Sequence, residues 1–477
     1  MVTFILINLP IYGVKIEPAQ VLAMLLLFQM ATYLVSANML FANDEGSFLT
    51  RGWLISRGRE PFKDFDSPLY LPGVQLIAAS FFFAFGPELH SAKMALAASG
   101  ALTTLLVYLI SRRLYGEMEG LTASAAFVLL APFFGSLFFM AENFQMPLSL
   151  LLFYALHSYD KDDKERPKWL FVSGLVCSAF FIIKLSGGLL LLAALAYIVL
   201  RRLARLGTTG TMIGESLILL SGFLLPLAAM ATALSTRGEA SEAFRQVFIF
   251  ALFIWKETLI HPLADVLPYL VIVFIPAASI PSALRDWKKG RREGVLLLLL
   301  TLATLYAIVM RFEPQRVIPA LPLACVILGP LAKGYLQTRP LRIAVSILVP
   351  VLMLLTLAPL VFVLKNQEPS PELDYIASHT SENDRIVALP FGLSMYFLSK
   401  REPGIRYIGL GPWGQFEETE ANAISDIKER QPKVILYSKI PQWGQNFSEY
   451  EPRLDKYIWE NYKMDGETES AYFLVPK

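Results

Sequence analysis

Long apolar runs separated by short polar segments dominate the first three quarters of the chain. About 20 apolar residues in a helix cross the roughly 30 Å hydrocarbon core of a bilayer, so these runs are candidate membrane-spanning helices. Eleven runs are found, at residues 19–41, 93–110, 121–140, 146–158, 169–183, 187–200, 213–234, 266–283, 295–310, 316–332 and 343–364. The pattern predicts an all-α polytopic membrane region over residues 1–364.

A twelfth apolar run covers residues 71–86 and is shorter than the others. As a helix its 16 residues span about 24 Å, and Pro72-Gly73 and Gly86-Pro87 interrupt it at both ends. We therefore expect a re-entrant or interfacial helix inside the long outer loop, residues 42–92. Residues 45–58 mix apolar and cationic side chains, which is typical of a second helix lying in the membrane interface.

The pattern changes after residue 364. Ser370-Pro371 is a typical helix start, and short apolar segments then alternate with amphipathic ones. Residues 365–477 are therefore predicted to form a small α/β domain, with strands at 385–390, 405–410, 433–438 and 471–475 and helices at 392–400, 418–430 and 450–462. The segment 409–414 matches G-x-G-x-x-G, but Pro412 removes a backbone N–H that a dinucleotide site needs, so we interpret it as a glycine-rich loop.

Composition narrows the class of protein. Hydrophobic residues make up 55% of the chain and charged residues 17%, which excludes a soluble enzyme, a disordered chain and a disulfide scaffold. The net charge of +2 gives no reason to expect a nucleic-acid partner. The two cysteines, Cys177 and Cys325, lie in apolar runs and are expected to be buried. The four histidines are scattered, so no cofactor is expected, and a divalent cation at the outer acidic loop stays an open alternative.

Lysine and arginine collect in alternate loops. With a cytoplasmic N-terminus and eleven spans, 18 of these residues fall inside and 11 outside. A rival topology, in which 71–86 spans and the N-terminus is outside, gives 21 and 8. We prefer eleven spans because 71–86 is short and broken at both ends. Both topologies agree on every loop after residue 93 and place the C-terminal domain outside the cell membrane.

Isolated carboxylates occur on the predicted outer face. Asp44 and Glu45 directly follow the first span, and Glu142 lies alone between two spans. Ionisable groups at such positions are costly and often functional. The alternative for Asp44 and Glu45 is a hydrated helix end, and the alternative for Glu142 is a snorkelling or solvated turn residue. Three outer cations accompany them, namely Lys184, Arg311 and Arg316. Fixed cations beside lipid suit a phosphate group, and the alternative is that Glu313 pairs with one of the two arginines.

These residues, in this order, resemble the GT-C superfamily of integral-membrane glycosyltransferases, and in particular the protein O-mannosyltransferases and aminoarabinose lipid A transferases (family 39-like). An acidic pair follows the first span, and a Pro-containing helix start follows at residues 67–73. An acid then occurs in the second outer loop, a Lys-containing break at 182–187 and a late Arg-containing segment at 316–322. The resemblance covers residues 19–335. Two departures are Glu142, where the family often has Asp, and the lack of a His before the Pro-rich segment.

The resemblance implies a transferase that takes a sugar from a polyprenyl-phosphate donor, such as dolichyl phosphate mannose. The acceptor is a hydroxyl of a protein, glycan or lipid on the extracytoplasmic face, and the anomeric centre is inverted. It also implies Asp44 as the base, Glu45 and Glu142 as further acids, and Lys184, Arg311 and Arg316 as ligands of the donor phosphate.

Two other classes of protein were weighed. A transporter or lipid-linked-sugar flippase would place ionisable residues near the membrane midplane, often within internal repeats, and we find no repeat. A non-catalytic assembly subunit would need neither acid. The prediction is a transferase of the cell membrane, with its C-terminal domain extracytoplasmic.

Overall fold

The protein was analysed as a computed structural model that describes residues 17–38, 42–162, 164–204, 209–251, 276–277, 279–281, 283–310, 314–336, 370–390, 392–412, 417–442 and 444–477. The chain divides into two compact units. Unit 1 comprises residues 1–38, 93–233 and 258–363, and unit 2 comprises residues 39–92, 234–257 and 364–477.

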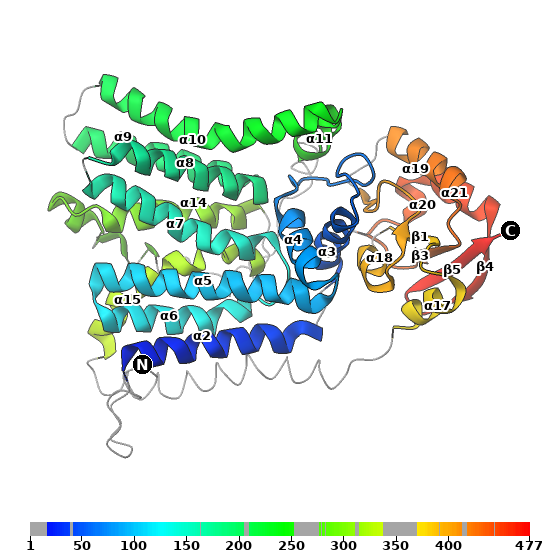
Figure 1. Cartoon of the computed structure of the whole chain (residues 1–477), viewed down its shortest axis with the longest axis horizontal. Helices are drawn as coiled ribbons and strands as arrows, with labels where there is room; N and C mark the ends of the chain where they lie inside the picture. The colour runs from blue at the N-terminus through cyan, green and yellow to red at the C-terminus, as the bar shows by residue number, and fades with distance from the viewer. Residues whose placement is uncertain are drawn as a thin grey trace, which may run out of the picture. The chain divides into compact units, whose positions relative to one another are not determined.

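Unit 1 is a bundle of long helices that lie side by side with nearly parallel axes (Figure 1). The helices are α2 (Pro18–Val35), α5 (Leu89–Tyr115), α6 (Glu117–Leu130), α7 (Ala141–Lys161), α8 (Arg166–Ile183), α9 (Gly187–Ala204), α10 (Thr209–Thr236), α14 (Glu293–Met310) and α15 (Leu321–Leu336). Cys177 and Cys325 are fully buried in its core, as predicted from their apolar surroundings.

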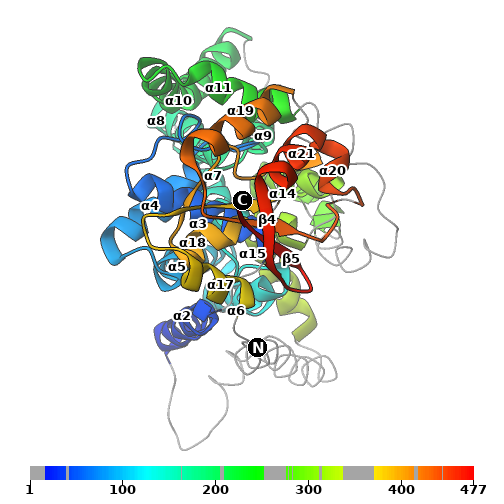
Figure 2. The same ribbon diagram turned by 90° about the vertical axis from the view of Figure 1, so that its right-hand side faces the viewer.

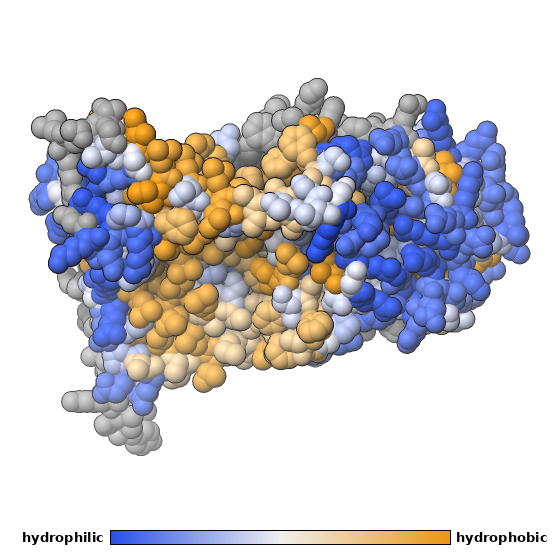
Figure 3. Space-filling view, turned by 45° about the horizontal axis from the view of Figure 1, so that its top comes forward, coloured by the Kyte–Doolittle hydropathy of each residue, from blue (hydrophilic) through white to orange (hydrophobic). Residues whose placement is uncertain are grey.

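The surface of unit 1 is that of a membrane protein. Among the described residues, five helices are long and apolar enough to cross a membrane: α2, α5, residues 117–134 beginning with α6, α8 and α10. Large apolar side chains are exposed on them, for example Leu27, Leu217 and Leu225, and Figure 3 shows apolar side chains covering the flank of the bundle. The predicted runs 266–283 and 343–364 lie largely or wholly outside the described residues. The count of eleven spans therefore stays a prediction.

Unit 2 begins with two helices, α3 (Ala42–Ser56) and α4 (Gly73–Phe85). Helix α4 has 13 residues, which agrees with the short helix predicted at 71–86. Helix α3 was predicted as an interfacial helix, but its apolar residues Phe48, Leu49 and Trp53 are fully buried. They are covered by protein because α3 packs closely against α4 and α18 (Leu393–Ser399). A Cβ on Gly46 would lie 2.6 Å from Cβ of Ser394 on α18, so this close approach requires glycine.

The C-terminal part of unit 2 forms a five-stranded sheet of order β2-β1-β3-β5-β4. Strand β1 pairs in parallel with β2 and β3, whereas β5 pairs antiparallel with β3 and β4. Helix α17 lies on one face, and α19 and α21 lie on the other (Figures 1 and 2). The elements are β1 (Arg385–Leu389), β2 (Glu402–Pro403), β3 (Val434–Ser438), β4 (Tyr462–Glu467), β5 (Ala471–Pro476), α17 (Pro371–His379), α19 (Glu417–Arg430), α20 (Phe447–Tyr450) and α21 (Pro452–Asn461).

Local sequence signals placed most of these elements. The hydroxyl of Ser370 caps α17 by accepting a hydrogen bond from the Leu373 amide, with Pro371 at the first helical position. The strand predicted at 405–410 is wrong, because these residues form no strand and the pairing partner of β1 is Glu402–Pro403. Their backbone is used elsewhere: the Arg406 carbonyl accepts from the Asp66 amide at 3.0 Å. Strand β4 was missed because its residues Lys463 to Glu467 are mostly polar.

Candidate active site

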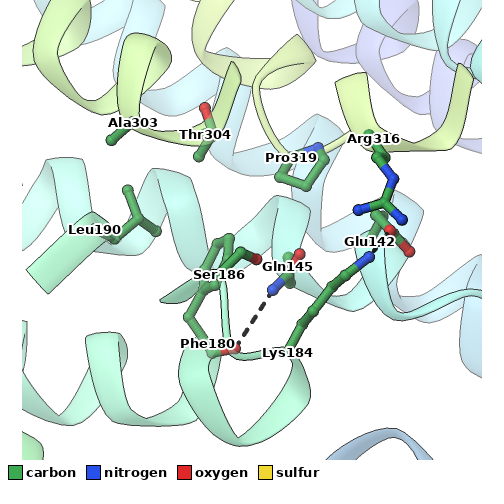
Figure 4. Close-up of a pocket in the computed structure, with 10 residues that line it drawn as sticks. All are labelled: Glu142, Gln145, Phe180, Lys184, Ser186, Leu190, Ala303, Thr304, Arg316 and Pro319. Atoms are coloured by element: carbon green, nitrogen blue, oxygen red, sulfur yellow. Dashed lines mark hydrogen bonds and ion pairs between the residues drawn. The ribbon is translucent and has the colours of Figure 1, made fainter. Parts of the chain in front are cut away.

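A pocket lies at one end of the unit 1 bundle. It is formed by the beginning of α7, the break between α8 and α9, a face of α14 and the turn that precedes α15 (Figure 4). Its lining combines charged, neutral polar and apolar side chains: Glu142, Gln145, Phe180, Lys184, Ser186, Leu190, Ala303, Thr304, Arg316 and Pro319.

The break between α8 and α9 positions Lys184. Helix α8 ends at Ile183, and Lys184 takes an extended conformation with φ −158° and ψ 136°. The chain then turns back within three residues, and the Gly187 amide donates to the Lys184 carbonyl at 3.0 Å. A Cβ on Gly187 would lie 2.4 Å from the Phe181 nitrogen, so the tight reversal requires glycine. The long side chain of Lys184 is thereby directed across the pocket (Figure 4).

Glu142 lies in the first turn of α7, and its side chain is 3% exposed. Its carboxylate forms an ion pair with the Lys184 ammonium. Arg316, on the 3₁₀ turn Pro314–Val317, interacts electrostatically with the same carboxylate and points toward it (Figure 4). The buried Glu142 carboxylate thus lies between two cations, Lys184 and Arg316, where α7 begins and α8 ends. A phosphate dianion can replace one carboxylate in such a group, because both anions accept the same charge-assisted hydrogen bonds.

The other residues that line the pocket are of two kinds, neutral polar and apolar. Gln145, Ser186 and Thr304 add neutral hydrogen-bonding groups, and Gln145 donates to the Phe180 carbonyl at 3.4 Å. Leu190, Ala303 and Pro319 are apolar. This combination suits an amphiphilic ligand that has an anionic group attached to an apolar chain. These residues were not among the predicted site residues, although Gln145 follows Glu142 by three positions and therefore shares its helix face.

The acidic pair Asp44-Glu45 lies in the first turn of α3, in unit 2. The two neighbours differ in environment: Asp44 is exposed, whereas Glu45 is 1% exposed. The Asp44 carboxylate lies at the surface of unit 2, and the Glu45 carboxylate is held within it. Adjacent residues on a helix point in different directions, so only one of the pair can face a given ligand.

Helix α3 is held in place by buried polar contacts that the sequence analysis did not identify. The Arg51 guanidinium donates to the Asp66 carbonyl at 2.6 Å and to its carboxylate at 3.1 Å. Both side chains are at most 5% exposed. The Asp66 carboxylate also accepts from the Ile408 amide at 3.2 Å, and the Thr50 hydroxyl donates to the Leu393 carbonyl at 2.6 Å. The C-terminal domain therefore fixes the helix that carries Asp44.

Of the six predicted site residues, the structure brings Glu142, Lys184 and Arg316 together in one pocket of unit 1. Asp44 and Glu45 share the first turn of α3 in unit 2. Arg311, with Glu313 as its alternative partner, lies outside the described residues. Within the part of the chain that the structure describes, no group of three or more His, Cys, Asp or Glu side chains could hold a metal ion.

Comparison with known proteins gives the class of the fold. The sequence model of the dolichyl-phosphate-mannose-protein mannosyltransferase family matches residues 66–235. No curated protein matches the sequence significantly. The structure is similar to the crystal structure of ArnT from Cupriavidus metallidurans bound to undecaprenyl phosphate, with a TM-score of 0.66 and 15% identity over 95% of this chain and 97% of that one.

A second similar structure is the archaeal oligosaccharyltransferase AglB from Archaeoglobus fulgidus, in complex with an inhibitory peptide and a dolichol-phosphate. It matches with a TM-score of 0.51 and 11% identity, over 96% of this chain and 76% of that one. The chain therefore has the fold of the GT-C glycosyltransferases. The resemblance inferred from the order of acids and cations in the sequence is confirmed.

Proposed function

We propose that the protein is a glycosyltransferase of the cell membrane that moves a sugar from a polyprenyl-phosphate donor to an acceptor hydroxyl on the extracytoplasmic face. The observation that carries this proposal is the pocket in which Lys184 and Arg316 converge on Glu142 beside an apolar wall. The match to a mannosyltransferase family over residues 66–235 supports it. So do the fold neighbours, whose structures were determined with undecaprenyl phosphate and with dolichol-phosphate.

In this proposal the two cations bind the donor phosphate and stabilise the charge that develops as it leaves. Charge-assisted hydrogen bonds to a phosphate are about twice as strong as neutral ones, and they act best where the developing charge is greatest. The isoprenoid part of the donor lies along the apolar side of the pocket. Arg311 is a further candidate for the same role.

Asp44 is the proposed base. It takes the proton of the acceptor hydroxyl while the hydroxyl oxygen attacks the anomeric carbon, and the bond from that carbon to the phosphate oxygen breaks. The products are a glycoside of inverted configuration, a polyprenyl phosphate and a protonated carboxyl group. A positioned general base contributes about 10²–10⁴-fold in rate. Glu45 and Glu142 are the alternative acids.

A transfer assay tests the proposal. Purified full-length protein in detergent is incubated with polyprenyl-phosphate sugars and a mixture of protein, glycan and lipid acceptors, and free polyprenyl phosphate is measured. Time-dependent release that needs an acceptor supports the proposal. If the protein instead moves lipid-linked sugars across vesicle membranes and releases no polyprenyl phosphate, it is a flippase.

Topology is tested separately by cysteine labelling of cells. Three exposed lysines are replaced one at a time by cysteine. Lys63 lies in the predicted outer loop, Lys456 in the C-terminal domain and Lys168 at the start of α8. An impermeant maleimide is expected to label the first two from outside and the third only after permeabilisation. Labelling of Lys63→Cys only from the cytoplasm would remove Asp44 from the reacting face.

A further inference from the structure

A second pocket lies within unit 2, where the loop after α3 meets the C-terminal sheet, and the transfer reaction has no use for it. Its walls come from four separate segments: the end of α3 and the following loop, the start of β1, strand β2 and the end of α19. The lining residues are Leu54, Arg59, Asp64, Phe65, Arg385, Glu402, Pro403 and Arg430.

Three arginines from three of these segments line this space, and two of them, Arg59 and Arg385, share the carboxylate of Glu402. Arg59 donates to Glu402 at 2.7 Å, and Arg385 lies 3.4 Å from the same oxygen. Arg57, just outside the pocket, approaches the other oxygen at 3.3 Å. Arg430 lies 3.6 Å from Asp426, one turn earlier on α19. A single carboxylate therefore serves as partner for several guanidinium groups.

Two of these arginines, Arg59 and Arg385, use few of their donor groups in side-chain hydrogen bonds. A guanidinium carries five N–H groups. Among the described residues, Arg59 donates one side-chain hydrogen bond, to Glu402, and Arg385 donates one, to the Pro403 carbonyl at 3.0 Å. Asp64 is engaged in its own loop, where it accepts from the Glu60 amide at 2.8 Å. The pocket thus holds more donors than its own acceptors use.

The electrostatics of Arg385 agree with an excess of positive charge. Burial lowers the pKa of this guanidinium, Glu402 raises it, and Arg430 and Arg59 lower it further. Neighbouring cations therefore repel each other here, although the carboxylates of Glu402 and Asp64 lie among them. A ligand with several anionic oxygens relieves this repulsion, whereas a single carboxylate, which Glu402 already supplies, does not.

We propose that this arginine pocket, formed by Arg59, Arg385 and Arg430, binds a phosphate-bearing ligand. The phosphate oxygens take the guanidinium donors that Glu402 leaves unused, and Leu54, Phe65 and Pro403 contact the less polar part of the molecule. The phosphate belongs either to a lipid headgroup or to a soluble phosphate ester. Because the pocket joins the loop after α3 to the domain that holds α3, its ligand also stabilises that junction.

The test measures binding without turnover, so it is independent of the transferase proposal. Full-length protein in detergent is titrated with inorganic pyrophosphate, and separately reconstituted in vesicles of phosphatidylcholine with or without phosphatidic acid. Thermal unfolding reports stabilisation in both. All titrations are repeated with the Lys184→Ala variant, in which phosphate binding at the unit 1 pocket is expected to be weakened, so that it does not contribute to the stabilisation measured. Stabilisation by pyrophosphate identifies a soluble ligand, and stabilisation only by phosphatidic acid identifies a lipid headgroup.

The variants decide whether binding occurs at this pocket. Arg59→Gln and Arg430→Gln are expected to weaken binding at least about tenfold, because each loses a charge-assisted contact. Arg453→Gln, an exposed arginine on α21, is the matched control and is expected to leave binding unchanged. Glu402→Gln removes the competing carboxylate and is expected to strengthen binding, which a purely structural ion-pair cluster does not do.

Two results would overturn the proposal. One is the absence of stabilisation of folded wild-type protein by either probe. The other is a binding constant that the variants do not change as expected. It would stay the same in the arginine variants, or it would not improve in Glu402→Gln, provided that this variant elutes from gel filtration at the wild-type volume. Arg59→Lys keeps the charge but not the fork of donors, so an intermediate affinity is expected.

Discussion

The two ends of the unit 1 bundle carry charge in different ways. At one end, α7, α9, α10 and α14 bring together a compact cluster of ion pairs: Tyr159, Asp160, Lys161, Arg201, Arg202, Glu215, Arg292 and Glu293. At the other end, Glu142, Lys184 and Arg316 surround a pocket. Because α7 has 21 residues, the two groups are separated by about 30 Å along it.

The first cluster is closed. Asp160 accepts from Arg201 at 2.5 Å and from Arg292 at 2.9 Å, and Arg201 has no exposed side-chain surface. Glu215 pairs with Arg202 and accepts from the Tyr159 hydroxyl at 2.8 Å. Charges that pair with one another in this way hold the helix ends together. The other end combines two cations and one acid that line a pocket. We expect the first cluster to stabilise the fold and the second one to bind an anionic ligand.

The largest expected effect is on stability, at the closed end. Arg201→Ala leaves Asp160 buried with one cation fewer, and breaking a buried ion pair costs about 3–5 kcal/mol. Thermal unfolding in detergent is expected to shift strongly downward. Arg113→Ala, an exposed arginine in the last turn of α5, is the control and is expected to stay within about 0.5 kcal/mol of wild type. Equal stability of the two variants would contradict the distinction between a closed end and a binding end.

The next effect is on donor use, at the open end. Lys184→Ala and Arg316→Ala each lose a charge-assisted contact with the donor phosphate, which is worth about 1.5–3 kcal/mol. The KM for donor is expected to rise at least about tenfold in each variant. Steady-state kinetics with Lys168→Ala, an exposed lysine at the start of α8, provide the comparison. Wild-type KM values in both pocket variants would mean that the phosphate binds elsewhere.

The smallest expected effect is on the pH dependence of stability, and it concerns Glu451, an acid whose pKa is shifted by burial and by a second acid. Glu451 is buried in the C-terminal domain beside Glu420, and burial, reinforced by Glu420, raises its pKa to about 8. The folded state therefore holds this proton more tightly than the unfolded state, whose ordinary value is near 4.5. Its contribution to stability is present at pH 4.5 and is lost as the pH rises toward 8.

Thermal unfolding measured between pH 5 and pH 9 checks this direction, because the unfolding temperature should fall as the pH rises. Glu451 is expected to account for ~4 °C or less of that fall. Glu451→Gln cannot ionise and is expected to flatten this part of the profile. Glu372, which accepts from Thr468 and Ser470, has its pKa lowered by these hydrogen bonds against the effect of burial, so Glu372→Gln is not expected to flatten it. The same pH dependence in wild type and Glu451→Gln would refute the assignment.

The sequence was sufficient where short-range signals decide structure. Twenty-residue apolar runs, the Ser370 cap and the short apolar segments at β1, β3 and β5 each predicted an element that the structure contains. Glu142, Lys184 and Arg316 were identified individually as isolated charges at helix ends. Their convergence was not predictable, because it depends on how α7, α8 and the turn before α15 pack, and 132 positions separate Lys184 from Arg316.

Contacts between distant segments account for the errors. Helix α3 has the amphipathic pattern of an interfacial helix, but α4 and α18 cover its apolar face. Residues 405–410 alternate like a strand, yet their backbone bonds to Asp66 in the outer loop, some 340 positions away. The contact between Arg51 and Asp66 was not predicted for the same reason. Nothing in the sequence indicates that Asp66, in a loop, pairs with Arg51 on a buried face of α3.

The most direct test of the central claim is the turnover of Asp44→Asn in the assay for release of polyprenyl phosphate. Asparagine keeps the size and hydrogen-bonding shape of aspartate but cannot accept the proton. The variant is expected to fold, bind donor with the wild-type KM and lose at least about 100-fold in turnover. Glu45→Gln is expected to lose less, and Glu142→Gln to fall between the two. Near-normal turnover of Asp44→Asn would contradict its role as base, and full activity of all three variants would contradict the transferase chemistry itself.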